Sequence, residues 1–139
     1  MLGKSEAQQV RIMDLRPNNW YINQAKLDKV REAWQSGTQD LIPPVLVTVI
    51  DGSLSLIDGH ARTYAAYERG ETYIVALISD LEQIEGSTAL YRHIHQEGPR
   101  IGIETIADLK NRIVGPQDHM RLWVGYCTKW LEEHDQEAC

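Results

Sequence analysis

The chain has 139 residues, of which 42% are hydrophobic and 24% charged, and its formal net charge is −6. This length suits one domain with a single core, and the composition is ordinary for a globular protein. Freestanding DNA-binding modules usually carry a basic face and a high pI, whereas the pI here is about 5.3. The sequence has no basic-then-apolar leader and no long apolar run, so we expect a cytoplasmic protein without membrane contact.

The first predicted strand follows a polar start. Residues 1–9 are polar, and we expect this N-terminus to be frayed. Residues 10–15 alternate apolar and polar side chains, which predicts a strand. The strand then meets Arg16-Pro17-Asn18-Asn19, a composition typical of a turn.

A helix and a hairpin are expected next. Residues 25–35 carry apolar side chains at helical spacing, with Lys26 and Lys29 directed outward. Residues 45–50 are rich in β-branched side chains, which favours a buried strand. Asp51-Gly52 follows and predicts a tight hairpin turn.

The return strand leads into a second helix. We predict a strand over residues 54–57, a helix over residues 60–69 that ends at Gly70, and a strand over residues 73–78. The three elements form a βαβ-like unit. If its two strands are parallel in one sheet, the crossover is expected to be right-handed.

The rest of the chain is predicted to be helical. Helices are expected over residues 87–96, from a Thr105 cap through Arg112, and from Pro116 to about Glu133. The last helix places apolar side chains on one face, which fits packing against its own domain better than a partner surface. We therefore divide the chain into a frayed segment 1–9, a domain 10–80 and a helical extension 81–139 on the same domain.

The sequence Asp58-Gly59-His60-Ala61-Arg62 lies where a strand is expected to pass into a helix. Gly59 permits backbone angles or close ligand approach that a side chain would obstruct. The N–H groups at the start of a helix bind phosphate, and Arg62 can chelate phosphate oxygens. His60 can donate a hydrogen bond or shuttle a proton. Asp58 would repel phosphate unless it held magnesium or served as a general base.

A purely structural interpretation of the same five residues is equally open. Asp58 can be the N-cap of the helix, accepting from the N–H of Ala61. Arg62 can pair with a nearby carboxylate. The local physics does not decide between a ligand site and a helix cap.

The order of motifs resembles that of the ParB/sulfiredoxin-like superfamily. The resemblance rests on Ile42-Pro43-Pro44-Val45, a hydrophobic hairpin, Leu56 to Arg62, Ala65-Ala66 and Gly70, and it covers about residues 10–80. It implies a small α/β (α+β) domain whose mixed sheet has flanking helices, with a helical C-terminal extension. It also implies a nucleotide at this turn, because ParB proteins bind CTP there and sulfiredoxins bind ATP.

A comparison with the superfamily, position by position, narrows the chemistry expected at this turn. Gly59 matches the glycine of the ParB motif Gly-Glu-Arg-Arg, and Arg62 matches its second arginine. His60 occupies the position of the motif's glutamate, and Ala61 occupies the position of its first arginine. Sulfiredoxins carry a catalytic cysteine in this turn, which this chain lacks. The resemblance therefore implies phosphate binding by Gly59, His60 and Arg62 without sulfiredoxin chemistry, and it adds the loop residues Asn18 and Asn19 to the binding site.

Three hypotheses for function follow. The first is binding of ATP, ADP or CTP with Mg²⁺, or of another small phosphorylated ligand, in a small-molecule kinase or nucleotide hydrolase. In it Asp58 and His60 are catalytic, and Asp58 holds the metal. The second is a non-enzymatic ParB-like DNA-partition or regulatory module, which the acidic charge disfavours. The third is an interaction protein in which the turn is a structural cap.

Overall fold

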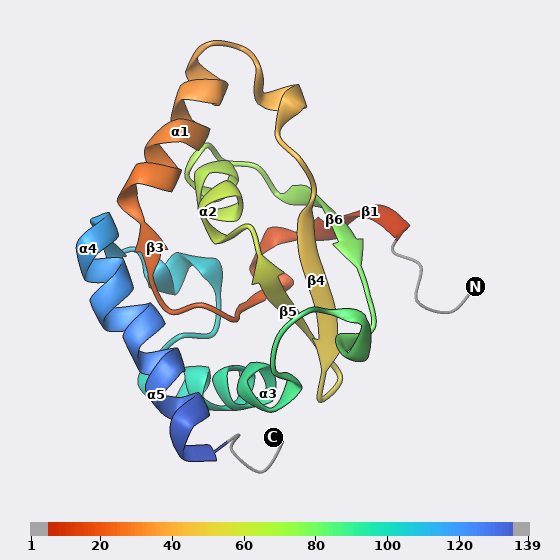
Figure 1. Cartoon of the computed structure of the whole chain (residues 1–139). Helices are drawn as coiled ribbons and strands as arrows, with labels where there is room; N and C mark the ends of the chain where they lie inside the picture. Colours follow the sequence, from red (N-terminus) through yellow and green to blue (C-terminus); the bar gives the residue numbers. More distant parts are fainter. Residues whose placement is uncertain (1–5, 135–139) are drawn as a thin grey trace.

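The computed structural model of the chain describes residues 6–134 (Figure 1). Of the segment predicted to be frayed, residues 1–5 lie outside the described residues. The prediction was wrong for residues 6–9, because they belong to strand β1 (Glu6–Arg11). This strand pairs antiparallel with β6 (Tyr73–Ile78) at one edge of a sheet. An edge strand can leave polar side chains in solvent while its backbone pairs, which explains a strand without an apolar pattern.

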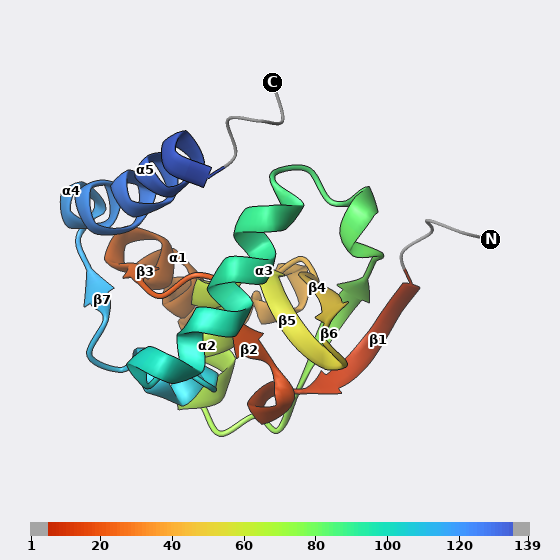
Figure 2. The same ribbon diagram turned by 90° about the horizontal axis from the view of Figure 1, so that it is seen from below.

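The main sheet is mixed and has five strands in the order β1-β6-β4-β5-β2. Its other three strands are β4 (Val45–Ile50), β5 (Ser53–Asp58) and β2 (Arg16–Pro17). β1 and β6 pair antiparallel, as do β4 and β5, whereas β4 with β6 and β2 with β5 are parallel. The predicted α/β class with a mixed sheet and flanking helices is confirmed (Figure 2).

The condition for a right-handed crossover, two parallel strands, is not met in the βαβ-like unit. β4 lies between β5 and β6, so these two strands are not neighbours, and they run in opposite directions. The reason is the tight turn, in which Asp51 and Gly52 both have positive φ, of 52° and 79°. This turn folds β5 directly back onto β4, and the other edge of β4 then accepts β6.

Two helices border the end of β5. α1 (Gln24–Gln35) begins at the cap Asn23, whose side chain accepts from the N–H of Ala25 at 2.9 Å. α2 (His60–Glu68) follows β5 directly and packs against α1 (Figure 1). α1 begins one residue before its predicted start and ends at the predicted residue. α2 begins as predicted and ends one residue earlier, because Arg69 is its C-cap.

The second half of the chain is mostly helical. α3 (Thr88–Glu97) follows the cap Ser87 and lies within one residue of the helix predicted over residues 87–96. The helix expected from Thr105 to Arg112 is shorter, a 3₁₀ turn over Ile106–Leu109 held by a capping box. Two further strands, β3 (Ile22–Asn23) and β7 (Ile113–Val114), pair in parallel.

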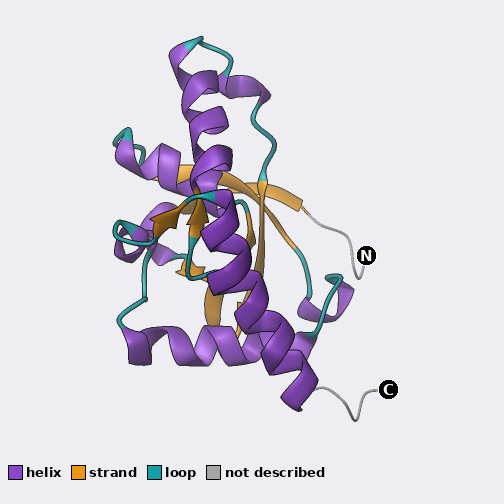
Figure 3. Ribbon diagram, turned by 60° about the vertical axis from the view of Figure 1, so that its left-hand side comes forward, coloured by secondary structure: helices purple, strands orange, loops and turns teal. Residues whose placement is uncertain are grey.

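The C-terminal helix runs in three parts. α4 (Pro116–His119) passes through a π-helical segment (Met120–Val124) into α5 (Gly125–His134) (Figure 3). Trp123 is buried, and its ring meets the edge of Trp20 at a centroid distance of 5.3 Å. Met120, an apolar residue of the helix predicted from Pro116 to about Glu133, is 61% exposed. The π segment changes the angular spacing of side chains, so the predicted apolar face does not stay in register.

The core joins the sheet to the helices that cover it. Its fully buried members come from α1, β4, β5, α2, β6 and the 3₁₀ turn, and they include Leu27, Val47, Leu56, Ala65, Ala76, Ile106 and Leu109. The end of β5 and the start of α2 are therefore held by packing on several sides. A rigid frame of this kind fixes the turn at Asp58 to Arg62.

Candidate functional site

The turn between β5 and α2 depends on a glycine. Gly59 has φ of 106° and ψ of 30°, a left-handed conformation that residues with a side chain rarely adopt. A Cβ atom built there would lie 2.5 Å from Cγ1 of Val45 in β4. The two requirements, angle and close approach, were both anticipated for Gly59, although the close neighbour is the protein itself.

The first turn of α2 has no side-chain cap. The first returning bond is from the N–H of Thr63 to the carbonyl of Gly59, at 2.8 Å, and the Thr63 hydroxyl donates to the same oxygen at 2.9 Å. Among the described residues, the N–H groups of His60, Ala61 and Arg62 have no acceptor. Unpaired amides at a helix start attract anions.

Asp58 is not the N-cap. Its carboxylate accepts a hydrogen bond from Nη2 of Arg62 at 3.1 Å instead of bonding the Ala61 N–H. Gly59, in its left-handed conformation, occupies the N-cap position of α2. The chain turns at Gly59, and this turn separates the Asp58 side chain from the axis of α2. The capping prediction for Asp58 was therefore wrong, whereas the predicted pairing of Arg62 with a carboxylate is confirmed.

Arg62 bridges the turn to the loop before β4. Its Nη1 donates to the carbonyls of Pro43 and Pro44 at 3.1 and 2.8 Å. With the bond to Asp58, three of the five N–H donors of the guanidinium are used. The side chain is 19% exposed, whereas that of Asp58 is 75% exposed. Arg62 thus holds the frame of the site and keeps two donors.

His60 points into the protein. It is 7% exposed, and its Nε2 accepts from the backbone N–H of Asn18 at 3.1 Å. Burial is the main cause that lowers the pKa of His60 to about 3, so the imidazole is neutral near pH 7. A buried ring with an engaged nitrogen is poorly suited to a proton shuttle, and this geometry favours a positioning role.

The two asparagines predicted to contact a ligand have different surroundings. Asn18 is 4% exposed, and its Nδ2 donates to Oγ of Ser55 at 3.0 Å and to the carbonyl of Tyr91 at 2.9 Å. Asn19 is half-buried, and its Oδ1 accepts from the N–H of Tyr21 at 2.9 Å. Asn19 lines the cleft at the turn, whereas Asn18 supports His60 from behind.

The turn opens onto a cleft of about 450 Å³ between α1, α2 and α4. Gly59, His60, Ala61 and Arg62 line one wall, and the other walls include Lys26, Lys29, Asn19, Asn23, Pro43, Asp58 and His119. The cleft thus has both an unpaired helix start and lysine side chains in its lining. Such an arrangement can bind an anion.

Lys26 and Lys29 were missed as site residues. The sequence pattern placed them on the outer face of α1, and both are exposed. Neither forms an ion pair among the described residues. Two lysines three residues apart lie on one face of a helix, so the sequence alone indicated that the two positive charges lie together. That this face borders the cleft at Gly59 depends on tertiary packing.

His119 extends the basic wall from α4. Its pKa is lowered from the ordinary value, first by burial and then by the charge of Lys26, while a hydrogen bond with the backbone of Tyr21 opposes the shift. His119 is therefore mainly neutral at pH 7 in the unliganded cleft. A bound anion would favour its protonated form.

The described residues contain no group of three or more His, Cys, Asp or Glu side chains that could hold a metal ion. Asp58 is the acidic side chain of the cleft and is largely exposed. A single carboxylate suits Mg²⁺ when a phosphate supplies further oxygen ligands. Across residues 6–134, no helix is long and apolar enough to cross a membrane.

Comparison with known proteins identifies similarity at the level of the fold. No protein-family model matches the sequence, and no curated protein matches it. Among solved structures, the protein Atu1540 from Agrobacterium tumefaciens has a TM-score of 0.51 at 15% identity, with 76% of this chain and 62% of that chain covered. The present chain thus spans less than two thirds of that protein.

Two further solved structures are similar to the chain at lower TM-scores. A sulfiredoxin from Arabidopsis thaliana has a TM-score of 0.45 at 19% identity, covering 64% of this chain and 96% of that chain. A Pnob8-like ParB-N domain has a TM-score of 0.39 at 20% identity, covering 55% and 29%. The structure with a TM-score above 0.5, the Agrobacterium tumefaciens protein, shares the fold of the present chain over the covered part. These similarities concern the fold alone and assign no ligand to this chain.

Proposed function

We propose that the chain binds a phosphate-bearing small molecule, and a nucleotide in particular, in the cleft between α1 and the start of α2. One observation carries the proposal: the uncapped N-terminus of α2 faces a cleft that also holds Lys26 and Lys29, neither of which has an ion-pair partner among the described residues. Amides and lysines supply hydrogen-bond donors and positive charge to an anion in the same cleft.

Each residue of the turn then has a distinct role. The amides of His60, Ala61 and Arg62 bind phosphate oxygens, and Lys26 and Lys29 neutralise their charge. Arg62 keeps the turn and the Pro43-Pro44 loop together and adds its two remaining donors. His60 holds the turn against Asn18. The proposed phosphate site is thus formed by α1, α2 and the loop that joins α1 to β4.

Asp58 gives the site a reactive group. Its carboxylate lies at the rim of the cleft and is 75% exposed, so it is accessible to solvent and to a ligand. We propose that Asp58 binds a Mg²⁺ ion carried by the nucleotide or accepts a proton from an attacking hydroxyl. Either role is compatible with a small-molecule kinase or a nucleotide hydrolase.

A thermal-shift screen tests the proposal. ATP, ADP and CTP, each with and without Mg²⁺, and a set of phosphorylated metabolites are added to the full chain. At least one of them should raise the melting temperature of the unmodified protein and not that of a Lys26→Glu/Lys29→Glu variant. Absence of a shift with every compound, from protein that unfolds cooperatively, would contradict the proposal.

The same material tests the DNA-partition alternative. A DNA-binding module should retard a duplex at low salt and lose affinity steeply as salt rises. Our proposal expects no retardation, because the net charge of −6 opposes association with a polyanion. Salt-sensitive retardation by the unmodified chain would favour the DNA module.

A further inference from the structure

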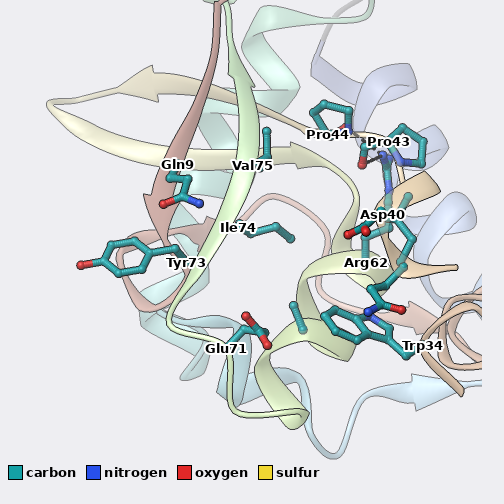
Figure 4. A pocket seen from close by; sticks show the side chains of 13 residues that line it. Gln9, Trp34, Asp40, Pro43, Pro44, Arg62, Glu71, Tyr73, Ile74 and Val75 are labelled. Carbon is teal, nitrogen blue, oxygen red and sulfur yellow. Dashed lines mark hydrogen bonds between the residues drawn. The ribbon is translucent and has the colours of Figure 1, made fainter. Parts of the chain in front are cut away.

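The guanidinium of Arg62 has few free donors for a ligand in the phosphate cleft. Its Nη1 carries two N–H groups and donates to the carbonyls of Pro43 and Pro44 at 3.1 and 2.8 Å (Figure 4). The other donors are the N–H of Nε and the two N–H groups of Nη2, and this edge of a guanidinium can hold two oxygens of one phosphate. Asp58 bonds to the same edge, because its Oδ2 accepts from Nη2 at 3.1 Å.

The contact between Asp58 and Arg62 can be broken without disturbing the fold. Asp58 is the last residue of β5 and pairs with Leu46 of β4, so its backbone is held by the sheet. Its carboxylate is largely exposed, and an exposed ion pair is weak and screened by salt. A ligand in the cleft can therefore displace the carboxylate while the Nη1 bonds to Pro43 and Pro44 keep Arg62 in place.

Asp58 also sets the negative charge of the cleft. It is the one acidic side chain among the described residues that line the cleft, whereas Lys26, Lys29 and Arg62 supply positive charge. Burial lowers the pKa of His60 and the charge of Asp58 opposes this shift, so the field of the carboxylate reaches the first residue of α2. A metal-free phosphate near the amides of α2 thus meets a like charge as well as an occupied Nη2.

We infer that Asp58 is a specificity-determining residue, which favours a phosphate that carries a divalent cation over the same phosphate without one. The inference rests on the proposed phosphate site. Without a cation, a phosphate has to displace the carboxylate from Nη2 of Arg62 and then remain beside its charge. With Mg²⁺ on the phosphate, the carboxylate turns to the cation as an oxygen ligand, the repulsion becomes attraction, and Nη2 is free to donate to the phosphate.

Calorimetric titration of the full chain with three probes tests the inference. The probes are sulfate, inorganic pyrophosphate in EDTA, and inorganic pyrophosphate with Mg²⁺. The variants are Asp58→Asn, which removes the charge, and Asp58→Ala, which removes the acceptor as well. Asp118→Asn is the matched control, because its carboxylate accepts from Arg121 at 3.2 Å on the surface and is not among the residues that line the cleft.

The unmodified chain should bind pyrophosphate about tenfold more tightly with Mg²⁺ than in EDTA, although the cation lowers the negative charge of the ligand. Both Asp58 variants should bind sulfate and metal-free pyrophosphate about tenfold more tightly than the unmodified chain does, because the competing carboxylate is gone. They should also lose the preference for Mg²⁺. Asp118→Asn should bind all three probes as the unmodified chain does.

Two failures can be told apart in this experiment. If the unmodified chain and both Asp58 variants bound sulfate equally, or if the preference for Mg²⁺ survived Asp58→Asn, the inference would be overturned and the phosphate site would stand. If no probe bound to any of the folded proteins, the proposed phosphate site would be contradicted, and the inference with it. Binding of sulfate by the Asp58 variants alone would support the inference.

Discussion

The backbone N–H of Asn18 donates to Nε2 of His60 across 3.1 Å, and both residues are almost fully buried. The bond ties the end of β2 to the first residue of α2 across 42 positions of sequence. It also fixes the imidazole as an acceptor at Nε2, so the ring proton is on Nδ1. The unpaired amides at the start of α2 are therefore held from behind by a neutral histidine.

This bond predicts acid sensitivity of the fold. The pKa of His60 is about 3 in the folded chain and about 6.5 when unfolded, so the unfolded state binds more protons below pH 6.5. Stability from this residue is complete above about pH 6.5 and is lost as the pH falls toward 3. At pH 5 the loss is about 2 kcal/mol.

Urea unfolding at neutral pH and near pH 5 measures this loss. His60→Gln should be less stable at neutral pH but should show a smaller loss between the two conditions. His134→Gln, at an exposed position, should retain the full acid sensitivity. If His60→Gln also kept the full acid sensitivity, the buried neutral histidine would not be the source of that sensitivity.

The second prediction concerns the close approach of Gly59 to Val45. Gly59→Ala adds a Cβ at a positive φ and 2.5 Å from Cγ1 of Val45, so we expect a loss of about 3 kcal/mol. Gly70 is a matched control, because its φ is 88° and a Cβ there would meet no atom within 4 Å. Gly70→Ala should lose about 1–2 kcal/mol by denaturant unfolding. Equal losses at the two glycines would show that contact with Val45 is unimportant.

The third prediction concerns Arg62 as a bridge. Arg62→Lys keeps the charge but cannot reach two carbonyls and a carboxylate in the planar geometry of a guanidinium. We expect a loss of about 2 kcal/mol and faster hydrogen exchange in residues 39–46. Arg100→Lys, in an exposed pair with Glu97, should change neither. Unaltered exchange in residues 39–46 would argue against the bridge.

The fourth prediction concerns the pH dependence of anion binding. The pKa of His119 is lowered by burial and by Lys26, and an anion in the cleft should raise it. Sulfate, whose charge is constant in this range, should therefore bind more tightly as the pH falls from about 7 to about 6. His119→Gln should bind sulfate with little pH dependence in calorimetric titration. A pH dependence that survives this substitution would place the titrating group elsewhere.

Much of the fold was predictable because local patterns specified it. The β-branched run at Val45–Ile50 and the apolar run at Tyr73–Ile78 became strands with those bounds. The Asp51-Gly52 turn gave the hairpin. Strand order was not readable in the same way, since the pairing of β6 with β4 depends on which sheet edge remains open after the hairpin forms.

The site was predictable in position and less so in detail. The conformation of Gly59 and the carboxylate pairing of Arg62 follow from residue chemistry over a few positions. The burial of His60 depends on Asn18, which lies far away in sequence. Likewise, Lys26 becomes part of the cleft because α1 packs on α2. Contacts between distant segments carry information that no single-sequence pattern contains.

Calorimetric titration of ATP with Mg²⁺, ADP and CTP into three proteins tests the central claim most directly. The proteins are the unmodified chain, Lys26→Glu/Lys29→Glu, and the matched control Lys110→Glu/Lys129→Glu, which reverses two exposed lysines outside the cleft. We predict that at least one nucleotide binds the unmodified chain and the control alike, and binds the cleft variant at least about tenfold more weakly. Equal weakening in both variants, or no binding to the folded unmodified chain, would contradict a phosphate site at the start of α2.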